Sequence, residues 1–238
     1  RGQKFTRNRR APVRYTRPVQ ASVSTTADLP GPWLPTAYRP IGVTGVPVRW
    51  DADGVVISRS DKAASTDYAM TSRVLTLRNL RPLERAAGSD RGAAGRATEL
   101  PIGVPLSLVD FADNAMAGGG SAYQRLTSLA NATANSEFTE NSTAGGDSFS
   151  YRALDNMITS SKSGSQAQFA TAFAVMARTK GFSTRLVAGY AMPTTAGGKV
   201  TTRDAIVWPE VNMTRVGWIP FAPGPQDLAR GVPVPTRY

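Results

Sequence analysis

An apolar helical pattern followed by strand-like pieces limits the fold more than any other feature of this sequence. The helical pattern begins between Ser163 and Gln166, and Gly181 stands where a C-terminal cap belongs. Its apolar stripe consists of Phe169, Ala170, Ala172, Phe173, Met176 and Ala177. Three β-type pieces follow, LVAGYAM, DAIVW and GWIPF, with a Gly197-Gly198 turn between the first two. Helices followed by a sheet indicate the α+β class.

The first third of the chain favours short antiparallel strands rather than βαβ units. Turn formers separate its β-type runs, which lie at 19–25, 45–50, 55–57 and 68–77. A small, Gly-rich run at 86–97 is typical of a linker. Beyond it, helical patterns at 105–116 and 123–130 precede a polar loop over 131–146. We therefore predict a basic arm and β-rich region over 1–90 and a core domain over 98–238.

The chain contains no cysteine and no histidine, and these absences exclude several kinds of chemistry. Without cysteine there is no disulfide, no thiol nucleophile and no thiolate metal site. Without imidazole there is no His general base, no Ser-His-Asp or Cys-His-Asp triad and no His-ligated metal. We accordingly expect no metal and no cofactor.

Positive charge is concentrated at the N-terminus. The chain has 28 Lys and Arg against 17 Asp and Glu, a formal net charge of +11, which favours anionic partners. Before the first acidic residue, Asp28, come Arg1, Lys4, Arg7, Arg9, Arg10, Arg14 and Arg17. The alternative to a binding patch is a solvated lead-in to the folded part. No apolar run reaches the roughly 18 to 20 residues of a membrane helix, so any membrane segment is expected outside this chain.

The segment GSQAQFATAFAVMARTKGFSTRLVAGY, residues 164–190, resembles the core of bacterial transglutaminase-like proteins. Their pattern is Gly-x-Cys-x-x-Phe/Tyr-Ala, an apolar helix, then Ala-Arg-x-x-Gly-x-x-x-Arg and a Gly-Tyr pair. The matching positions are Phe169, Ala170, Ala177, Arg178, Gly181, Arg185, Gly189 and Tyr190. The His-Ala-Trp-x-Glu-Val strand and the Gly-Trp-x-x-Phe-Asp-Pro-Thr-Pro ending of the family correspond to 206–211 and 217–225. LPGPWLP at 29–35 and YAMTSRV at 68–74 resemble the module that precedes this core in bacterial multi-pass membrane proteins.

This resemblance implies a papain-like transglutaminase core, with helices packed on an antiparallel sheet, after a small β-rich region. It also places Gln166 at the Cys position, Ile206 at the His position and Ala222 at the Asp position. None of these side chains supplies the thiolate, proton acceptor or orienting carboxylate that thioester chemistry requires. We expect the three side chains to converge, with Ile206 largely buried and with Ile206 and Ala222 on adjacent strands.

The resemblance therefore predicts a catalytically inactive extracytoplasmic module at the bacterial cell membrane. Its expected partner is an envelope protein or an anionic wall polymer, and the candidate binding residues are Gln166, Trp208, Trp218, Arg9, Arg10, Arg14 and Arg17. The alternative is a Ser/Lys hydrolase in the same groove, built from Ser160, Ser161, Lys162, Ser163 and Ser165, although such a polar run also supplies helix caps. Nucleic-acid binding is disfavoured because the chain has no recognition helix, RNP pattern or zinc knuckle.

Overall fold

Two compact units, Arg1–Arg78 and Asn79–Arg237, make up the chain. The computed structural model describes residues 15–26, 32–37, 39–50, 56–58, 67–77, 79–88, 98–141, 148–192 and 198–235. Sequence reasoning placed the division near residue 90, but residues 79–88 pack with the second unit. The N–H of Thr214 donates to the carbonyl of Ala87 at 2.9 Å, and Gly88 pairs with Met213 across an isolated bridge.

The first unit contains a three-stranded antiparallel sheet with strand order β1-β5-β2. Its strands are β1 (Thr16–Ser24), β2 (Arg39–Thr44) and β5 (Asp67–Leu75), and a two-stranded sheet pairs β3 (Val48–Trp50) with β4 (Val56–Ser58). Side chains of β5 alternate, so Tyr68 and Met70 pack with Leu34 and Val43 in a small core. The predicted β-rich region is therefore present, and four of its strands lie close to the predicted runs, whereas β2 (Arg39–Thr44) was not predicted.

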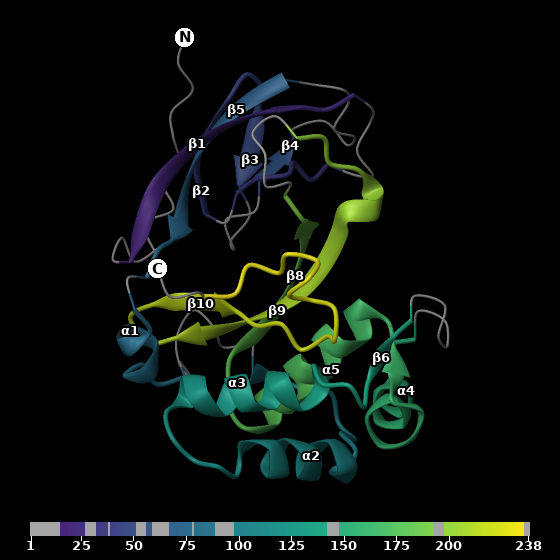
Figure 1. Ribbon diagram of the computed structural model, residues 1–238. Coiled ribbons are helices and arrows are strands. Elements are labelled where there is room, and N and C mark those ends of the chain that lie inside the picture. Colours follow the sequence, from purple (N-terminus) through teal and green to yellow (C-terminus); the bar gives the residue numbers. More distant parts are fainter. Residues whose placement is uncertain are drawn as a thin grey trace. The chain divides into compact units, whose positions relative to one another are not determined.

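The second unit is helical first and then β-structured (Figure 1). Its helices are α1 (Arg81–Glu84), α2 (Leu106–Met116), α3 (Ala122–Thr133), α4 (Tyr151–Asn156), the π-helical turn η2 (Met157–Ser161), α5 (Gln166–Thr179) and the 3₁₀ turn η3 (Thr202–Asp204). Its main sheet has the order β10-β9-β8, from β8 (Thr184–Tyr190), β9 (Ala205–Met213) and β10 (Gly217–Pro220), all antiparallel. The α+β prediction is confirmed.

Helix α5 forms the centre of this unit, and nearly every side of the helix is buried. It packs on β8 and β9, while α2 and α3 pack against α5 in turn. Phe169, Phe173 and Met176 are at most 1% exposed, and the ring of Phe173 stacks on Phe221 at a centroid distance of 5.3 Å. Burial of large apolar side chains of this kind is the main force that holds the helices on the sheet. The helix ends before Gly181, whose φ of +79° is the left-handed conformation of a C-terminal cap.

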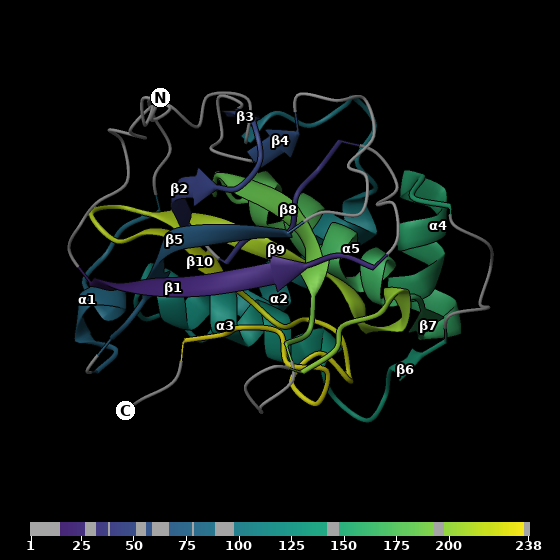
Figure 2. The same cartoon turned by 90° about the horizontal axis from the view of Figure 1, so that it is seen from above.

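A short parallel pair, β6 (Thr139–Glu140) and β7 (Ser163–Gly164), lies beside the beginning of α5 (Figure 2). β6 and the last turn of α3 fall in the segment 131–146, which was predicted to be a loop. That prediction was wrong for 131–133 and 139–140, where α3 continues through Thr133 and the chain pairs with β7. Within the described part of the chain, the helices are too short and too polar to span a bilayer.

Candidate functional site

The site is built on the first turn of α5. Ser165 is the N-cap residue: its hydroxyl accepts the N–H of Gln168 at 3.3 Å, and the Gln168 side chain accepts the N–H of Ser165 at 2.9 Å. This reciprocal pair satisfies two of the N–H groups that a helix leaves free at its start. The helix consequently begins at Gln166, the position of the nucleophile in the resemblance. The Gln166 side chain is buried, with 8% of the residue exposed.

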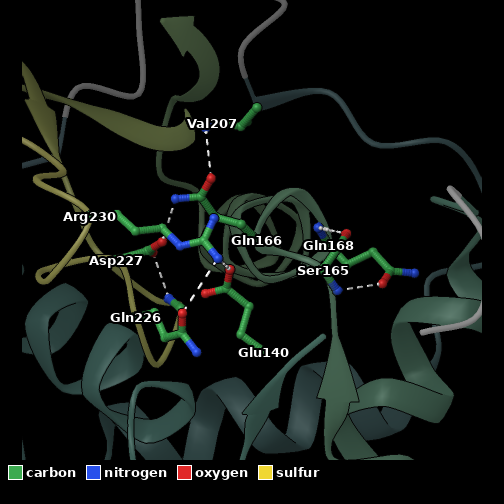
Figure 3. Close-up of polar contacts among 9 residues, drawn as sticks. Glu140, Ser165, Gln166, Gln168, Val207, Gln226, Asp227 and Arg230 are labelled. Carbon is green, nitrogen blue, oxygen red and sulfur yellow. Dashed lines mark hydrogen bonds and ion pairs between the residues drawn. The ribbon is translucent and has the colours of Figure 1, made fainter. Parts of the chain in front are cut away.

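Both ends of the Gln166 amide are occupied (Figure 3). Its Oε1 accepts the backbone N–H of Val207 on β9 at 3.1 Å, and its Nε2 donates to Oδ1 of Asp227 at 2.8 Å. Because one partner is a donor and the other an acceptor, the amide fits in one orientation. Gln166 therefore joins the helix to the sheet and to the C-terminal segment.

Asp227 is the acceptor on that C-terminal segment, and it is fully buried. Its second oxygen, Oδ2, accepts the N–H of Gly224 at 2.7 Å, which closes a turn. Burial raises the pKa of Asp227, while the Gln166 amide, the Gly224 N–H and the Arg230 charge act in the opposite direction. Sequence reasoning did not find this residue, since a single Asp after Pro-Gly-Pro-Gln looks like ordinary turn chemistry.

An ion pair lies next to Asp227. Arg230 NH2 is 2.7 Å from Oε1 of Glu140, whose side chain is 4% exposed, whereas the Arg230 side chain is 40% exposed. The other Glu140 oxygen, Oε2, is buried and has no hydrogen-bond partner in the described part of the chain. Burial raises the pKa of Glu140 above its ordinary value. Neither residue was a candidate from the sequence.

The other two triad positions lie in one apolar cluster. Ile206 (4% exposed) and Ala222 (8% exposed) share this cluster with Trp208 and Val232. Ile206 is also the residue before Val207, whose N–H bonds Gln166, so Gln166 lies close to Ile206, which in turn shares the cluster with Ala222. One detail was wrong: Ala222 follows the end of β10 at Pro220 and does not lie on the strand.

The Trp and Arg residues that match the family pattern serve the scaffold. Arg185 on β8 faces Glu210 on β9 as its cross-strand partner, and its Nε and NH2 lie 2.9 and 2.7 Å from Glu210 Oε2. The guanidinium also lies 4.4 Å from the ring centroid of Trp218, and Trp208 Nε1 donates to Glu210 Oε1 at 3.3 Å. Trp208 and Trp218 were named as binding candidates, and here both complete the surroundings of one buried carboxylate.

The Ser/Lys alternative finds no support in these contacts. The Lys162 amine donates to the Ile158 carbonyl and lies 4.9 Å from the ring centroid of Phe138. Ser165 serves as a helix cap, and the Ser161 hydroxyl donates to the carbonyl of Ser163 at 3.2 Å. The lysine thus contacts a backbone carbonyl and a ring rather than a serine hydroxyl.

The basic arm can be followed only at its end. Arg9, Arg10 and Arg14 lie outside the described residues, and Arg17 is an exposed residue of β1. No group of three or more Asp and Glu with metal-binding geometry occurs among the residues that the structure describes. The site within those residues is therefore a polar cluster formed by Gln166, Asp227, Glu140 and Arg230.

Comparisons with known proteins agree with this geometry. The model of the transglutaminase-like superfamily matches residues 109–223. Two crystal structures of the periplasmic domain of TgpA from Pseudomonas aeruginosa, one bound to ethylmercury, are similar to the chain with TM-scores of 0.65 and 0.66. They are 18% and 20% identical in sequence, and the matches cover 87% and 90% of this chain and 72% and 71% of theirs. A search of functionally curated proteins finds no match.

The start of α5 packs against an antiparallel sheet, and together with the family match and the similar structures this identifies a papain-like α+β fold. The chain carries a domain of the transglutaminase-like superfamily. The predicted family and fold are thus confirmed. Because the chain has no cysteine, chemistry that depends on a cysteine nucleophile is not available to it.

Proposed function

We propose that this transglutaminase-like domain is catalytically inactive and acts as a binding or scaffolding module on the extracytoplasmic side of the cell envelope. The observation that carries the proposal is the Gln166 amide, which is hydrogen-bonded at both ends where the family's nucleophile would stand. A catalytic nucleophile needs an adjacent base and room for substrate, whereas Gln166 is buried and cannot ionise.

The neighbouring positions support the same proposal. Ile206 packs with Trp208 and Val232, so an apolar side chain fills the place of the base. The location is proposed from the two similar structures, which are periplasmic domains. The partner proposed is an envelope protein or an anionic wall polymer, since the chain carries a formal net charge of +11.

The first test is an activity assay. We expect amine incorporation into a Gln-donor peptide, deamidation and peptide hydrolysis all to stay at the buffer background. Turnover above background that Ser163→Ala or Lys162→Met abolishes would contradict the proposal and revive the Ser/Lys hydrolase.

The second test addresses binding. The domain is incubated with purified anionic wall polymer and, separately, with cross-linked envelope membranes, and a variant with Arg9, Arg10, Arg14 and Arg17 changed to Ser serves as the control. Polymer binding that weakens with salt and is lost in the control supports the polymer partner. Specific cross-linking to one envelope protein, retained in the control, supports the protein partner. The binding role fails if neither occurs.

A further inference from the structure

The C-terminal part of the site is a short segment, residues 223–235, which we call the closing segment. It is attached to the rest of the unit at several points. The Pro223 carbonyl accepts the Thr133 hydroxyl at 2.9 Å, Asp227 accepts the Gln166 amide at 2.8 Å, and Val232 packs with Ile206. The Arg230–Glu140 ion pair, at 2.7 Å, is its attachment to β6.

The two carboxyl groups at this segment differ in how their oxygens are satisfied. Both oxygens of Asp227 accept N–H groups, from Gln166 at 2.8 Å and from Gly224 at 2.7 Å. Glu140 has an ion-pair partner on Oε1, while its buried Oε2 has no hydrogen-bond partner in the described part of the chain. A buried carboxylate oxygen without a donor is costly, whereas a protonated carboxyl group is neutral and itself a donor. The geometry thus favours a charged Asp227 and a Glu140 that readily takes up a proton.

The charges around Glu140 point in the same direction. The single positive charge of Arg230 lies near two carboxyl groups, those of Glu140 and Asp227, and the Arg230 side chain is 40% exposed. On the helical side, α5 contributes the uncharged Gln166, and the Lys162 amine is directed to the Ile158 carbonyl and the Phe138 ring. The pKa of Glu140 is raised by burial first and by Asp227 second, while Arg230 and the Gln226 backbone N–H lower it.

We propose that Glu140 is a proton-binding site, and that protonation as the pH becomes mildly acidic strengthens the attachment of the closing segment. With both carboxyl groups charged, the buried cluster carries one negative charge more than Arg230 compensates. One proton on Glu140 makes the cluster neutral, so the buried Oε2 no longer carries uncompensated charge, while Arg230 can still donate to Oε1. The proposal concerns the closing segment alone and holds whether or not the domain is catalytic.

The sign of the pH dependence follows from linkage. In the unfolded chain Glu140 is in water with an ordinary pKa of about 4.3, so the native state binds the proton more tightly than the unfolded state does. The stability that Glu140 contributes therefore increases as the pH falls through the raised native pKa. This contribution reaches its full size once the pH is below the pKa of Glu140 in the unfolded chain, and it is lost again as the pH rises.

The experiment compares thermal unfolding of the wild-type domain, Glu140→Gln and Glu137→Gln from about pH 4.5 to about pH 8. Glu137 is an exposed residue of the same stretch and serves as the matched control. The melting temperature of the wild type should rise relative to that of Glu140→Gln as the pH falls, while Glu137→Gln should follow the wild type in parallel. A difference between wild type and Glu140→Gln that stays constant over this range overturns the proposal.

Two further measurements report on the segment and on the proton directly. Hydrogen-exchange protection of the Arg230 and Val232 amides, which bond Gln226 and Asp227 within the segment, should increase severalfold at acidic pH in the wild type and stay constant in Glu140→Gln. Carbon-13 NMR of the Glu140 carboxyl group needs no variant and decides the case even if Glu140→Gln does not fold. A titration midpoint above the ordinary Glu value supports the proposal, and a midpoint at or below it refutes the proposal.

Discussion

The cross-strand pair of Arg185 and Glu210 offers the sharpest test of what holds the sheet together. Glu210 is 1% exposed and receives two N–H bonds from the Arg185 guanidinium, at 2.9 and 2.7 Å on Oε2. Its other oxygen accepts the Trp208 indole at 3.3 Å, and Trp218 covers the guanidinium. Replacing Arg185 by Met keeps an unbranched side chain about as long as the stem that carries the guanidinium, but it removes the guanidinium and its charge.

The loss should be large, because the substitution leaves a buried carboxylate without its counter-charge. Breaking a buried ion pair from one side costs about 3–5 kcal/mol. We expect the lower end, about 3 kcal/mol, because the Arg185 side chain is 28% exposed and water can replace part of its role. The lost contact with Trp218 adds roughly 0.5–1 kcal/mol. A domain with a typical stability of about 5–15 kcal/mol would therefore remain folded but be clearly weakened.

Urea unfolding of Arg185→Met, Glu210→Gln and the double variant measures this coupling. The matched control is Lys180→Met, which breaks the 2.6 Å pair with Asp113, a side chain that is 62% exposed, and should cost less than about 1 kcal/mol. The double variant should be less destabilised than the sum of the single variants, since the glutamine that replaces Glu210 carries no buried charge. Simple additivity, or a loss for Arg185→Met no larger than for Lys180→Met, would refute the reasoning.

Two other predictions concern packing and a phenol group. Gly189→Ala should destabilise the domain by about 1–3 kcal/mol in the same assay, because the new Cβ would lie 2.8 Å from the ring of the buried Trp208, whereas Gly118→Ala, with no atom within 4 Å, should be nearly neutral. Burial raises the pKa of Tyr68 to about 12, so its phenol, which donates to the Pro35 carbonyl, stays protonated in the folded state. The Tyr68 phenol therefore contributes stability below about pH 10, and this contribution is lost as the pH rises toward 12. Alkaline unfolding curves, followed by phenolate absorbance, should show this loss in the wild type and not in Tyr68→Phe.

Local signals in the sequence were sufficient to predict α5 and the strands that follow it. Ser165 precedes an apolar stripe and Gly181 follows it, and the helix runs from Gln166 to Thr179. The convergence of Gln166 with Ile206 was also predictable, although through the resemblance and not through periodicity. A match to the motif positions of a family predicts which distant residues lie close together in the fold, whereas a hydrophobic pattern predicts only local structure.

The polar half of the site could not be predicted in the same way. The bond between Gln166 and Asp227 joins residues 61 positions apart, and Glu140 and Arg230 meet only because β6 and the closing segment reach the same end of α5. Each is an ordinary loop or turn residue when considered alone. The structure divides the chain between Arg78 and Asn79 and not near residue 90, and the contact of Ala87 with Thr214, which joins this stretch to the second unit, is long-range and leaves no local pattern.

The structure also explains how this papain-like scaffold can persist without a Cys-His-Asp triad. A thiolate at the start of α5 would be stabilised by the helix dipole and an imidazole, and both the charge and the partner are absent at Gln166. The uncharged Gln166 amide instead makes two hydrogen bonds, to Val207 at 3.1 Å and to Asp227 at 2.8 Å. The apolar side chain of Ile206 occupies the adjacent space. Each change supports the others, because a smaller residue at 166 would leave the Val207 N–H and one Asp227 oxygen without this partner. The position that requires reactivity in an enzyme therefore serves here as a cross-link between helix, sheet and closing segment.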